Sequence, residues 1–141
     1  MPFRVRACVV CEQARPEVLG KWTLLGFFGL APTIRVAIAN FQLPVTLCFG
    51  FMSEEFAGRI TANVRVVASS GPIGGVSPPV QADIPATRPL TMLFLHFQGV
   101  APGPGRYTVV LTVNGEDVFE TSFLLENPDQ SLRARFGQAV Q

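Results

Sequence analysis

Residues 106–125 read RYTVVLTVNGEDVFETSFLL, two runs of alternating side chains on either side of Asn114-Gly115. Asparagine and glycine tolerate the positive φ angles of a tight two-residue turn, so the pattern predicts a β-hairpin. In the first run one face is expected to carry the side chains of Tyr107, Val109, Leu111 and Val113, and the other those of Thr108, Val110 and Thr112. The chain therefore contains antiparallel β-structure with one buried face.

The same period of two recurs through the chain, whereas helical periodicity is hard to find. Apolar residues alternate from Ile60 to Ala68, and they share one face of the runs 44–52 and 90–98. Residues 53–58 are suited to one helical turn, with serine at the start and glycine at the end. About eight short strands separated by turn signals predict an all-β fold, and more specifically an antiparallel immunoglobulin-like β-sandwich of about seven to nine strands with at most short helical turns.

The segment before the hairpin supports the sandwich. Pro102-Gly-Pro-Gly-Arg-Tyr107 resembles the tyrosine corner of immunoglobulin-like domains, although the Cys-Trp-Cys core of antibody domains does not map onto this chain. Residues 69–79, SSGPIGGVSPP, read as a loop inside one domain. The G-x-x-G spacing in this loop is not followed by the Lys-Ser/Thr of a phosphate cradle. We expect a single β-sandwich domain over 1–128 and a C-terminal tail, 129–141, that is a short helix or frayed.

Composition excludes several classes of protein. The 141 residues are 48% hydrophobic and 15% charged, with a formal net charge of +1, which argues against disorder, a general nucleic-acid binder and an anionic membrane surface. The longest weakly polar stretch, 22–34, is shorter than the roughly 20 residues that a membrane helix needs. No secretion signal is read at the N-terminus, and three cysteines fit a reducing compartment. We therefore expect a cytoplasmic protein.

Cys8 and Cys11 form a C-x-x-C pair, a spacing found in zinc and redox sites. The pair lies in an alternating run, and on a strand two residues three apart point to opposite faces. The thiols should therefore diverge rather than converge on a metal ion, and no helix N-terminus follows them as a redox site would require. We expect buried free cysteines, no metal and no other cofactor.

Material for catalysis is sparse. His96 is the one histidine of the chain, it lies mid-strand, and no serine stands in a G-x-S-x-G elbow. A nucleophile pair of Cys48 and His96 stays open, because such partners meet in space rather than in sequence. We otherwise expect a non-enzymatic protein with no catalytic residue. Twelve phenylalanines against one tryptophan and one tyrosine indicate core rather than a sugar-binding platform, so a carbohydrate-binding sandwich is a lesser alternative.

Residues 90–98 carry apolar side chains on both faces. If Leu93, Leu95 and Phe97 point into the sandwich, Met92, Phe94 and His96 point outward, with Val110 beside them on a neighbouring strand. Such an outward apolar stripe indicates a second covered face, covered either by the loop at 69–79 or by another protein. The expected function is a protein-binding or assembly module that binds a partner or self-associates. A structural subunit of a phage-derived or secretion particle is the alternative, and a small-molecule ligand is left open.

Two groups of residues resemble a known family. They are the opening C-x-x-C-E of residues 8–12 with Arg15-Pro-Glu17, Gly20-Lys21 and LLGFFG at 24–29, and the closing PG-x-Y-x-V-x-L-x-x-NGE at 104–116. Together they look like a group of small, mainly bacterial proteins of unknown function that is similar to immunoglobulin-like β-sandwiches. The resemblance implies a fold and a cytoplasmic origin. It implies no activity, cofactor or functional residue.

Overall fold

The computed structural model describes residues 3–18, 21–32, 35–37, 44–54, 56–74, 77–86 and 90–126. These residues form ten strands and no α-helix. The strands are β1 (Val5–Pro16), β2 (Trp22–Leu30), β3 (Arg35–Ala37), β4 (Pro44–Glu54), β5 (Gly58–Ala68), β6 (Gly71–Pro72), β7 (Val80–Ile84), β8 (Leu90–Val100), β9 (Gly105–Val113) and β10 (Glu116–Glu126). The predicted all-β class is confirmed. The tail predicted at 129–141 lies outside the described residues.

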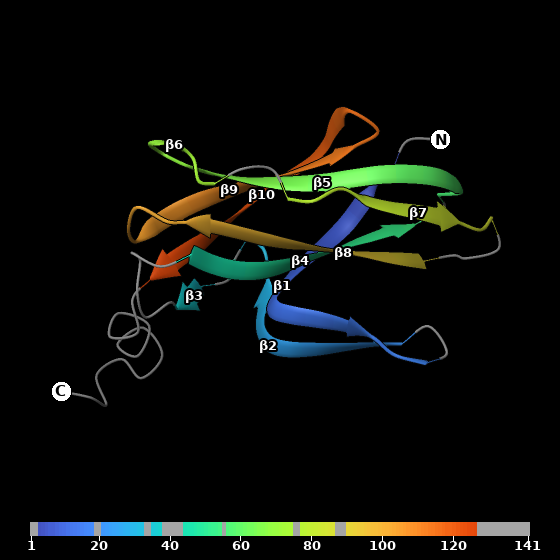
Figure 1. Ribbon diagram of the computed structural model, residues 1–141, viewed down its shortest axis with the longest axis horizontal. Helices are drawn as coiled ribbons and strands as arrows, with labels where there is room; N and C mark the ends of the chain where they lie inside the picture. The colour runs from blue at the N-terminus through green and yellow to red at the C-terminus, as the bar shows by residue number, and fades with distance from the viewer. Residues whose placement is uncertain are drawn as a thin grey trace.

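The strands form two sheets that lie over one another (Figure 1). One sheet has the order β2-β1-β4-β8, and the other has the order β3-β10-β9-β5-β6 with β7 also paired to β5. Neighbouring strands are antiparallel except β3 and β10, the parallel pair among the described strands. The hairpin predicted from Asn114-Gly115 is β9–β10, and both turn residues have positive φ (52° and 84°).

The core lies between the two sheets, where the predicted faces meet. The alternating residues from Ile60 to Ala68 are buried, as are the inward residues of β8 and β9, so these period-two predictions are confirmed. Aromatic contacts join the two sheets: the ring of Phe49 on β4 lies 5.8 Å from that of Phe123 on β10. The two layers therefore share one apolar interior.

The corner before β9 has the predicted contact. The Tyr107 hydroxyl donates a hydrogen bond to the carbonyl oxygen of Gly103, four residues upstream, and the tyrosine ring is buried in the core. The ring also stacks on Phe123 of β10, with 20° between the two planes. This side chain ties the entry of β9 to the interior.

One local prediction, the helical turn at 53–58, is wrong. Residues 53 and 54 do not start a helical turn, because they extend β4 and pair with β8 as far as Leu90. β1 continues as strand through Arg15-Pro16. A register shift lies between Val5 and Ala7 of β1, so Val5 packs against the core before the shift and Cys8 and Val10 lie in the core after it. One extra residue in a strand exchanges the faces that its side chains occupy.

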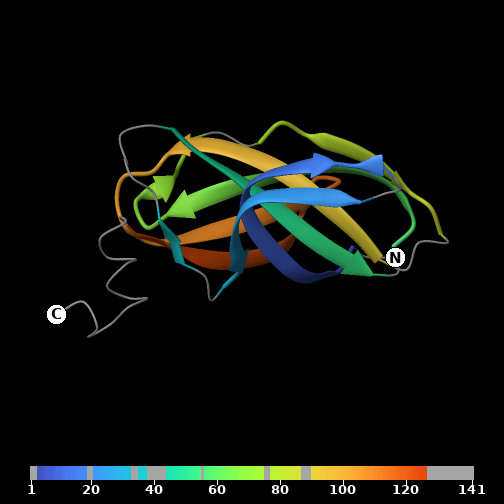
Figure 2. The same ribbon diagram turned by 90° about the horizontal axis from the view of Figure 1, so that it is seen from below.

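The extended end of β1 gives the fold its unusual feature. Pairing of β1 with β4 ends at Cys11, whereas pairing with β2 continues to Pro16. Beyond Cys11 the β1–β2 hairpin leaves the sheet plane and crosses the outer face of β4 and β8 (Figure 2). We call residues 13–16 and 22–25, the paired ends of β1 and β2, the crossing hairpin.

Candidate binding surface

The outer face of the first sheet is built from three rows of side chains that run across β1, β4 and β8. In register these rows are Ala7–Met52–Met92, Val9–Gly50–Phe94 and Cys11–Cys48–His96. Three of the four predicted partner-binding residues, Met92, Phe94 and His96, thus lie on one outer face, where the alternation of β8 had placed them. The middle row depends on a glycine, because a Cβ at Gly50 would lie 2.5 Å from the ring of Phe94.

The crossing hairpin covers this face. The Trp22 ring lies 4.4 Å from that of Phe94 between centroids, and Phe94 is 8% exposed. The backbone N–H of Ala14 donates a hydrogen bond to Nε2 of His96 (3.4 Å). Beneath the hairpin lies a second apolar cluster, which we call the outer-face cluster; it consists of Cys11, Ala14, Cys48 and Phe94, with Val9, Leu24 and Met92 packed against it.

The predicted second covered face therefore exists, but its cover is neither of the two that the sequence suggested. The loop at 69–79 lies elsewhere: Ile73 enters the main core, and the Cβ position of Gly74 lies 3.0 Å from the carbonyl oxygen of Gln98 on β8. The hydroxyl of Ser77 accepts a hydrogen bond from the backbone N–H of Val64. The described part of this loop therefore lies near Gln98 at one end of β8 and leaves the Phe94 side to the hairpin.

Val110 does not join the other three residues. It lies on β9, which pairs with β5 and β10, whereas β8 pairs with β4 in the other sheet. Val110 is opposite Arg65 and Glu120 on the outer face of the second sheet. The expectation that β8 and β9 are neighbours in one sheet is wrong, because consecutive strands of a two-layer fold can belong to different layers.

The cysteine pair behaves as the strand geometry predicted. Cys8 packs in the core between the sheets and Cys11 in the outer-face cluster, so their side chains lie on opposite faces of β1. All three cysteines are buried and free. Among the residues that the structure describes, no three His, Cys, Asp or Glu side chains gather as they would around a metal ion.

Cys48 and His96 do meet in space, since they are directly opposite one another on β4 and β8. Burial, however, and to a smaller extent the nearby Cys11, raise the pKa of the Cys48 thiol to about 12. A nucleophilic cysteine needs a lowered pKa or an adjacent base. The thiol is thus protonated at neutral pH, and Nε2 of its histidine neighbour already accepts the Ala14 hydrogen bond.

The exposed apolar surface lies on β2, at the edge of the first sheet. The side chains of Trp22, Leu25, Phe27 and Leu30 are 41%, 37%, 56% and 50% exposed. Residues 22–30 include no charged residue, and among the described strands β2 has β1 as its pairing partner on one side. Sequence reasoning noted an apolar run here but assigned it no role. The feature that could have identified this surface is a run of nine residues, typical of a strand, in which no side chain is charged.

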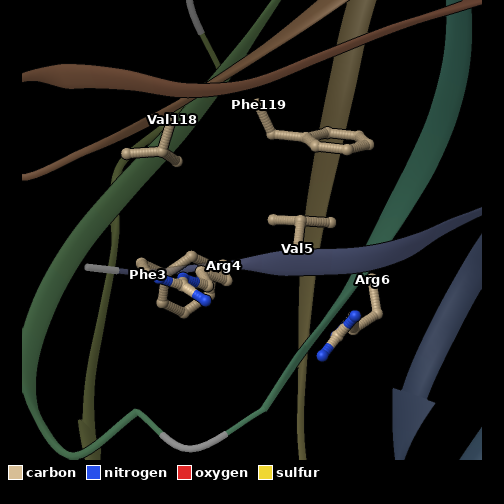
Figure 3. A pocket seen from close by; sticks show the side chains of 6 residues that line it. All are labelled: Phe3, Arg4, Val5, Arg6, Val118 and Phe119. Carbon is tan, nitrogen blue, oxygen red and sulfur yellow. The ribbon is translucent and has the colours of Figure 1, made fainter. Parts of the chain in front are cut away.

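A hollow of about 500 Å³ opens at the start of β1. It is lined by Phe3, Arg4, Val5, Arg6, Val118 and Phe119. Figure 3 shows Val5 and Phe119 pointing toward one another between β1 and β10, whereas Arg6 projects from the other side of β1. Nε of Arg6 forms an ion pair with Glu54 at 3.0 Å. Arg6 therefore does not point into the apolar part of this hollow.

Comparison with known proteins gives little guidance. No family model and no curated protein matches the chain. Among solved structures, one from Pseudomonas fluorescens, the alkylpurine DNA glycosylase AlkC bound to DNA containing an abasic site analog, aligns with a TM-score of 0.36 and 19% sequence identity. The alignment covers 68% of this chain and 28% of that one, so the chain spans about a quarter of its length. The described part of the chain holds no helix with the length and apolar character needed to cross a bilayer.

Proposed function

We propose that this protein is a non-enzymatic protein-binding or assembly module that acts through the exposed edge of β2. The observation that carries the proposal is the edge itself: nine residues of strand without a charged side chain, with Leu25 and Phe27 exposed on either side of Gly26. Natural sheets usually protect a long edge with charge, proline or a short strand. An apolar edge that lacks charge and proline suits the addition of a strand from a partner.

The outer-face residues support this function indirectly. Phe94 underlies Trp22, and Met92 packs against the same cluster, so together they hold the crossing hairpin in place. His96 adds a hydrogen bond to Ala14. In this proposal Met92, Phe94 and His96 position β2 for a partner rather than contact the partner. Val110 has no part in it.

The fold is proposed to be immunoglobulin-like. The order β1-β4-β8 corresponds to strands A, B and E of such sandwiches, and β5, β9 and β10 correspond to C, F and G. The Tyr107 hydroxyl, bonded back to Gly103, matches the tyrosine corner at the start of strand F. In this assignment β2 is an additional strand, paired with strand A at the edge of its sheet. Membership of the small bacterial family and a cytoplasmic location stay predictions.

A structural subunit of a larger particle is the second candidate, because the same edge can join subunits into an array. A partner-binding module pairs β2 with one strand of a partner. A particle subunit needs a second contact on another surface of the same chain. The exposed Leu90 and Val100 of β8, at the opposite edge of the first sheet, are the residues to examine for that contact.

Site-specific photo-crosslinking in cells of the source organism tests the proposal. A benzophenone amino acid replaces Phe27, and in a matched control it replaces Leu90, which is similarly exposed on the other edge of the sheet. We expect one dominant covalent protein adduct from position 27, identified by mass spectrometry, and little from position 90. The absence of an adduct at position 27 would contradict a function through β2. Dominant adducts at both would favour the particle subunit.

A further inference from the structure

Two of the three cysteines face one another across neighbouring strands. Cys11 on β1 and Cys48 on β4 are directly opposite in register, and both side chains belong to the outer-face cluster. The Cys11 thiol donates a hydrogen bond to the carbonyl oxygen of Cys48, with 3.8 Å between Sγ and O. A hydrogen bond also joins the two thiols. The two sulfur atoms therefore lie side by side on one face of the sheet.

This arrangement meets the geometric requirement of a disulfide. Residues directly opposite one another on antiparallel strands have Cα atoms about 4.5 or 5.5 Å apart, depending on the type of pair. Both separations lie within the range of about 4.4–6.8 Å found in disulfides. Cys8 does not meet the requirement, because its side chain packs between the sheets, on the face of β1 opposite to that of Cys11.

We propose that Cys11 and Cys48 are a reversible redox pair, which a peroxide oxidises to a disulfide. The Cys11 thiolate attacks one oxygen of the peroxide, the O–O bond breaks, and a sulfenic acid forms. The sulfur of Cys48 then attacks that of Cys11, the S–O bond breaks, and water leaves. The two thiols together lose two electrons and two protons, and hydrogen peroxide becomes two molecules of water. This chemistry goes beyond the binding function and does not depend on the partner of β2.

The surroundings of the two thiols assign their roles. Burial raises the pKa of both, but the hydrogen bond between them lowers the pKa of Cys11 and raises that of Cys48. A hydrogen bond with the backbone of Gln13 also lowers the pKa of Cys11. The thiolate is the nucleophilic form of cysteine. Cys11 therefore attacks the peroxide, and Cys48 resolves the sulfenic acid.

The crossing hairpin controls access to the pair. Both thiols are fully buried, and Ala14 and Leu24 of the hairpin pack in the same cluster. The peroxide therefore reaches Cys11 when the hairpin opens. Cys11 is also the last residue of β1 that pairs with β4, next to the point where the hairpin leaves the sheet. A disulfide at this position fixes the base of the hairpin to β4.

Peptide mapping of the oxidised full chain tests the proposal. The reduced protein is treated with hydrogen peroxide under native conditions, its remaining thiols are blocked with iodoacetamide in urea, and it is digested with trypsin. We expect a disulfide between peptides 7–21 and 36–59, which fragmentation should place on Cys11, with Cys8 alkylated. Dithiothreitol should separate the two peptides. A disulfide that includes Cys8, sulfinic acid without a disulfide, or three unreacted thiols would overturn the proposal.

Single substitutions provide the matched controls. Cys11→Ala and Cys48→Ala should each abolish the disulfide within the chain. Cys8→Ala, which removes a buried thiol from the other face of β1, should leave it in place. A disulfide that persists in Cys11→Ala or Cys48→Ala would overturn the assignment. Circular dichroism establishes that each variant is folded, and the mapping of the unmodified chain decides the question without any variant.

The rate of oxidation and the stability of the product test the role of the hairpin. Trp22→Ala weakens the contact with Phe94 and should accelerate disulfide formation about five-fold. The disulfide joins residues 37 positions apart, so the oxidised chain should melt roughly 10 °C above the reduced one. An unchanged rate would overturn the control of access by the hairpin. An unchanged or lower melting temperature would overturn the placement of the bond in the native sheet.

Discussion

Gly50 is the residue on which the packing of the outer-face cluster depends. In its place a Cβ would lie 2.5 Å from the Phe94 ring and 2.6 Å from a methyl group of Val9. We expect Gly50→Ala to destabilise the protein by about 1–3 kcal/mol, the usual cost of overpacking. Urea denaturation measures the change. Gly103→Ala is the matched control, because no atom lies within 4 Å of its Cβ position. Equal effects at both glycines would contradict the packing argument.

Tyr107 contributes a second effect at the residue scale, through its hydroxyl. Tyr107→Phe keeps the buried ring and its stacking on Phe123 but removes the hydrogen bond to the Gly103 carbonyl. A typical intramolecular hydrogen bond stabilises a protein by about 1 kcal/mol, so the free energy of unfolding should fall by that amount. The same denaturation experiment measures it. No change in stability would mean that the corner does not depend on this bond.

Individual residues were the most predictable part of the molecule. The inward residues of β5, β8 and β9, the divergent thiols of Cys8 and Cys11 and the Tyr107 contact all follow from period-two alternation or from a short local motif. Such features depend on neighbours along one strand. The faces of β1 were less predictable, because an extra residue between Val5 and Ala7 shifts the alternation and leaves no mark in the composition.

At the scale of elements, the crossing hairpin shields two thiols, and opening it should expose them. Trp22→Ala removes an aromatic contact with Phe94 that is typically worth about 1 kcal/mol, so the open state should become about five-fold more populated. Alkylation of Cys11 and Cys48 with iodoacetamide, followed residue by residue by mass spectrometry, should accelerate by a similar factor.

Two comparisons make this measurement specific. Leu25→Ala shortens an exposed apolar side chain on the same strand and should leave both rates unchanged. Cys8 serves as an internal reference, because it packs between the sheets rather than under the hairpin. If Cys8 accelerated together with the other two thiols, the substitution would have loosened the whole fold, and a local opening of the hairpin would be ruled out.

The arrangement of the strands in space could not be predicted from the sequence. The apolar outer side of β8 was visible in the alternation of Met92 and Phe94, but its cover was not. Strand composition gives no direction in space, and the crossing hairpin depends on β1 leaving β4 after Cys11 while it remains paired with β2. The wrong placement of Val110 beside β8 has the same cause, because the order of strands in the sequence does not say which sheet a strand joins.

At the scale of the whole molecule, burial of the thiols should make the free energy of unfolding depend on pH in the alkaline range. Burial raises the pKa of Cys8 and Cys48 from 9.0 to about 12 and also raises that of Cys11. Below pH 9 the thiols are protonated in both the folded and unfolded chains, so the native state has its full stability. Above pH 9 the unfolded thiols ionise and the folded ones do not. Stability should then fall up to pH 12, by at most about 1.4 kcal/mol per pH unit for each thiol.

At acid pH the stability should also depend on pH, but there it falls as the pH decreases, and the group responsible is a carboxylate rather than a thiol. Hydrogen bonds from Arg65 and Thr112 lower the pKa of Asp117 from 3.8 to about 2, so its contribution is present above pH 3.8 and is lost as the pH falls through 2. Thermal melts across the pH range should therefore show a plateau between the two limbs. Cys48→Ala should flatten the alkaline limb, and Asp117→Asn the acid limb. Because the Asp117 side chain is exposed to solvent and Cys48 is buried, we expect the alkaline change to be the larger. An alkaline limb with the same slope in Cys48→Ala as in the unmodified protein would mean that other groups cause it.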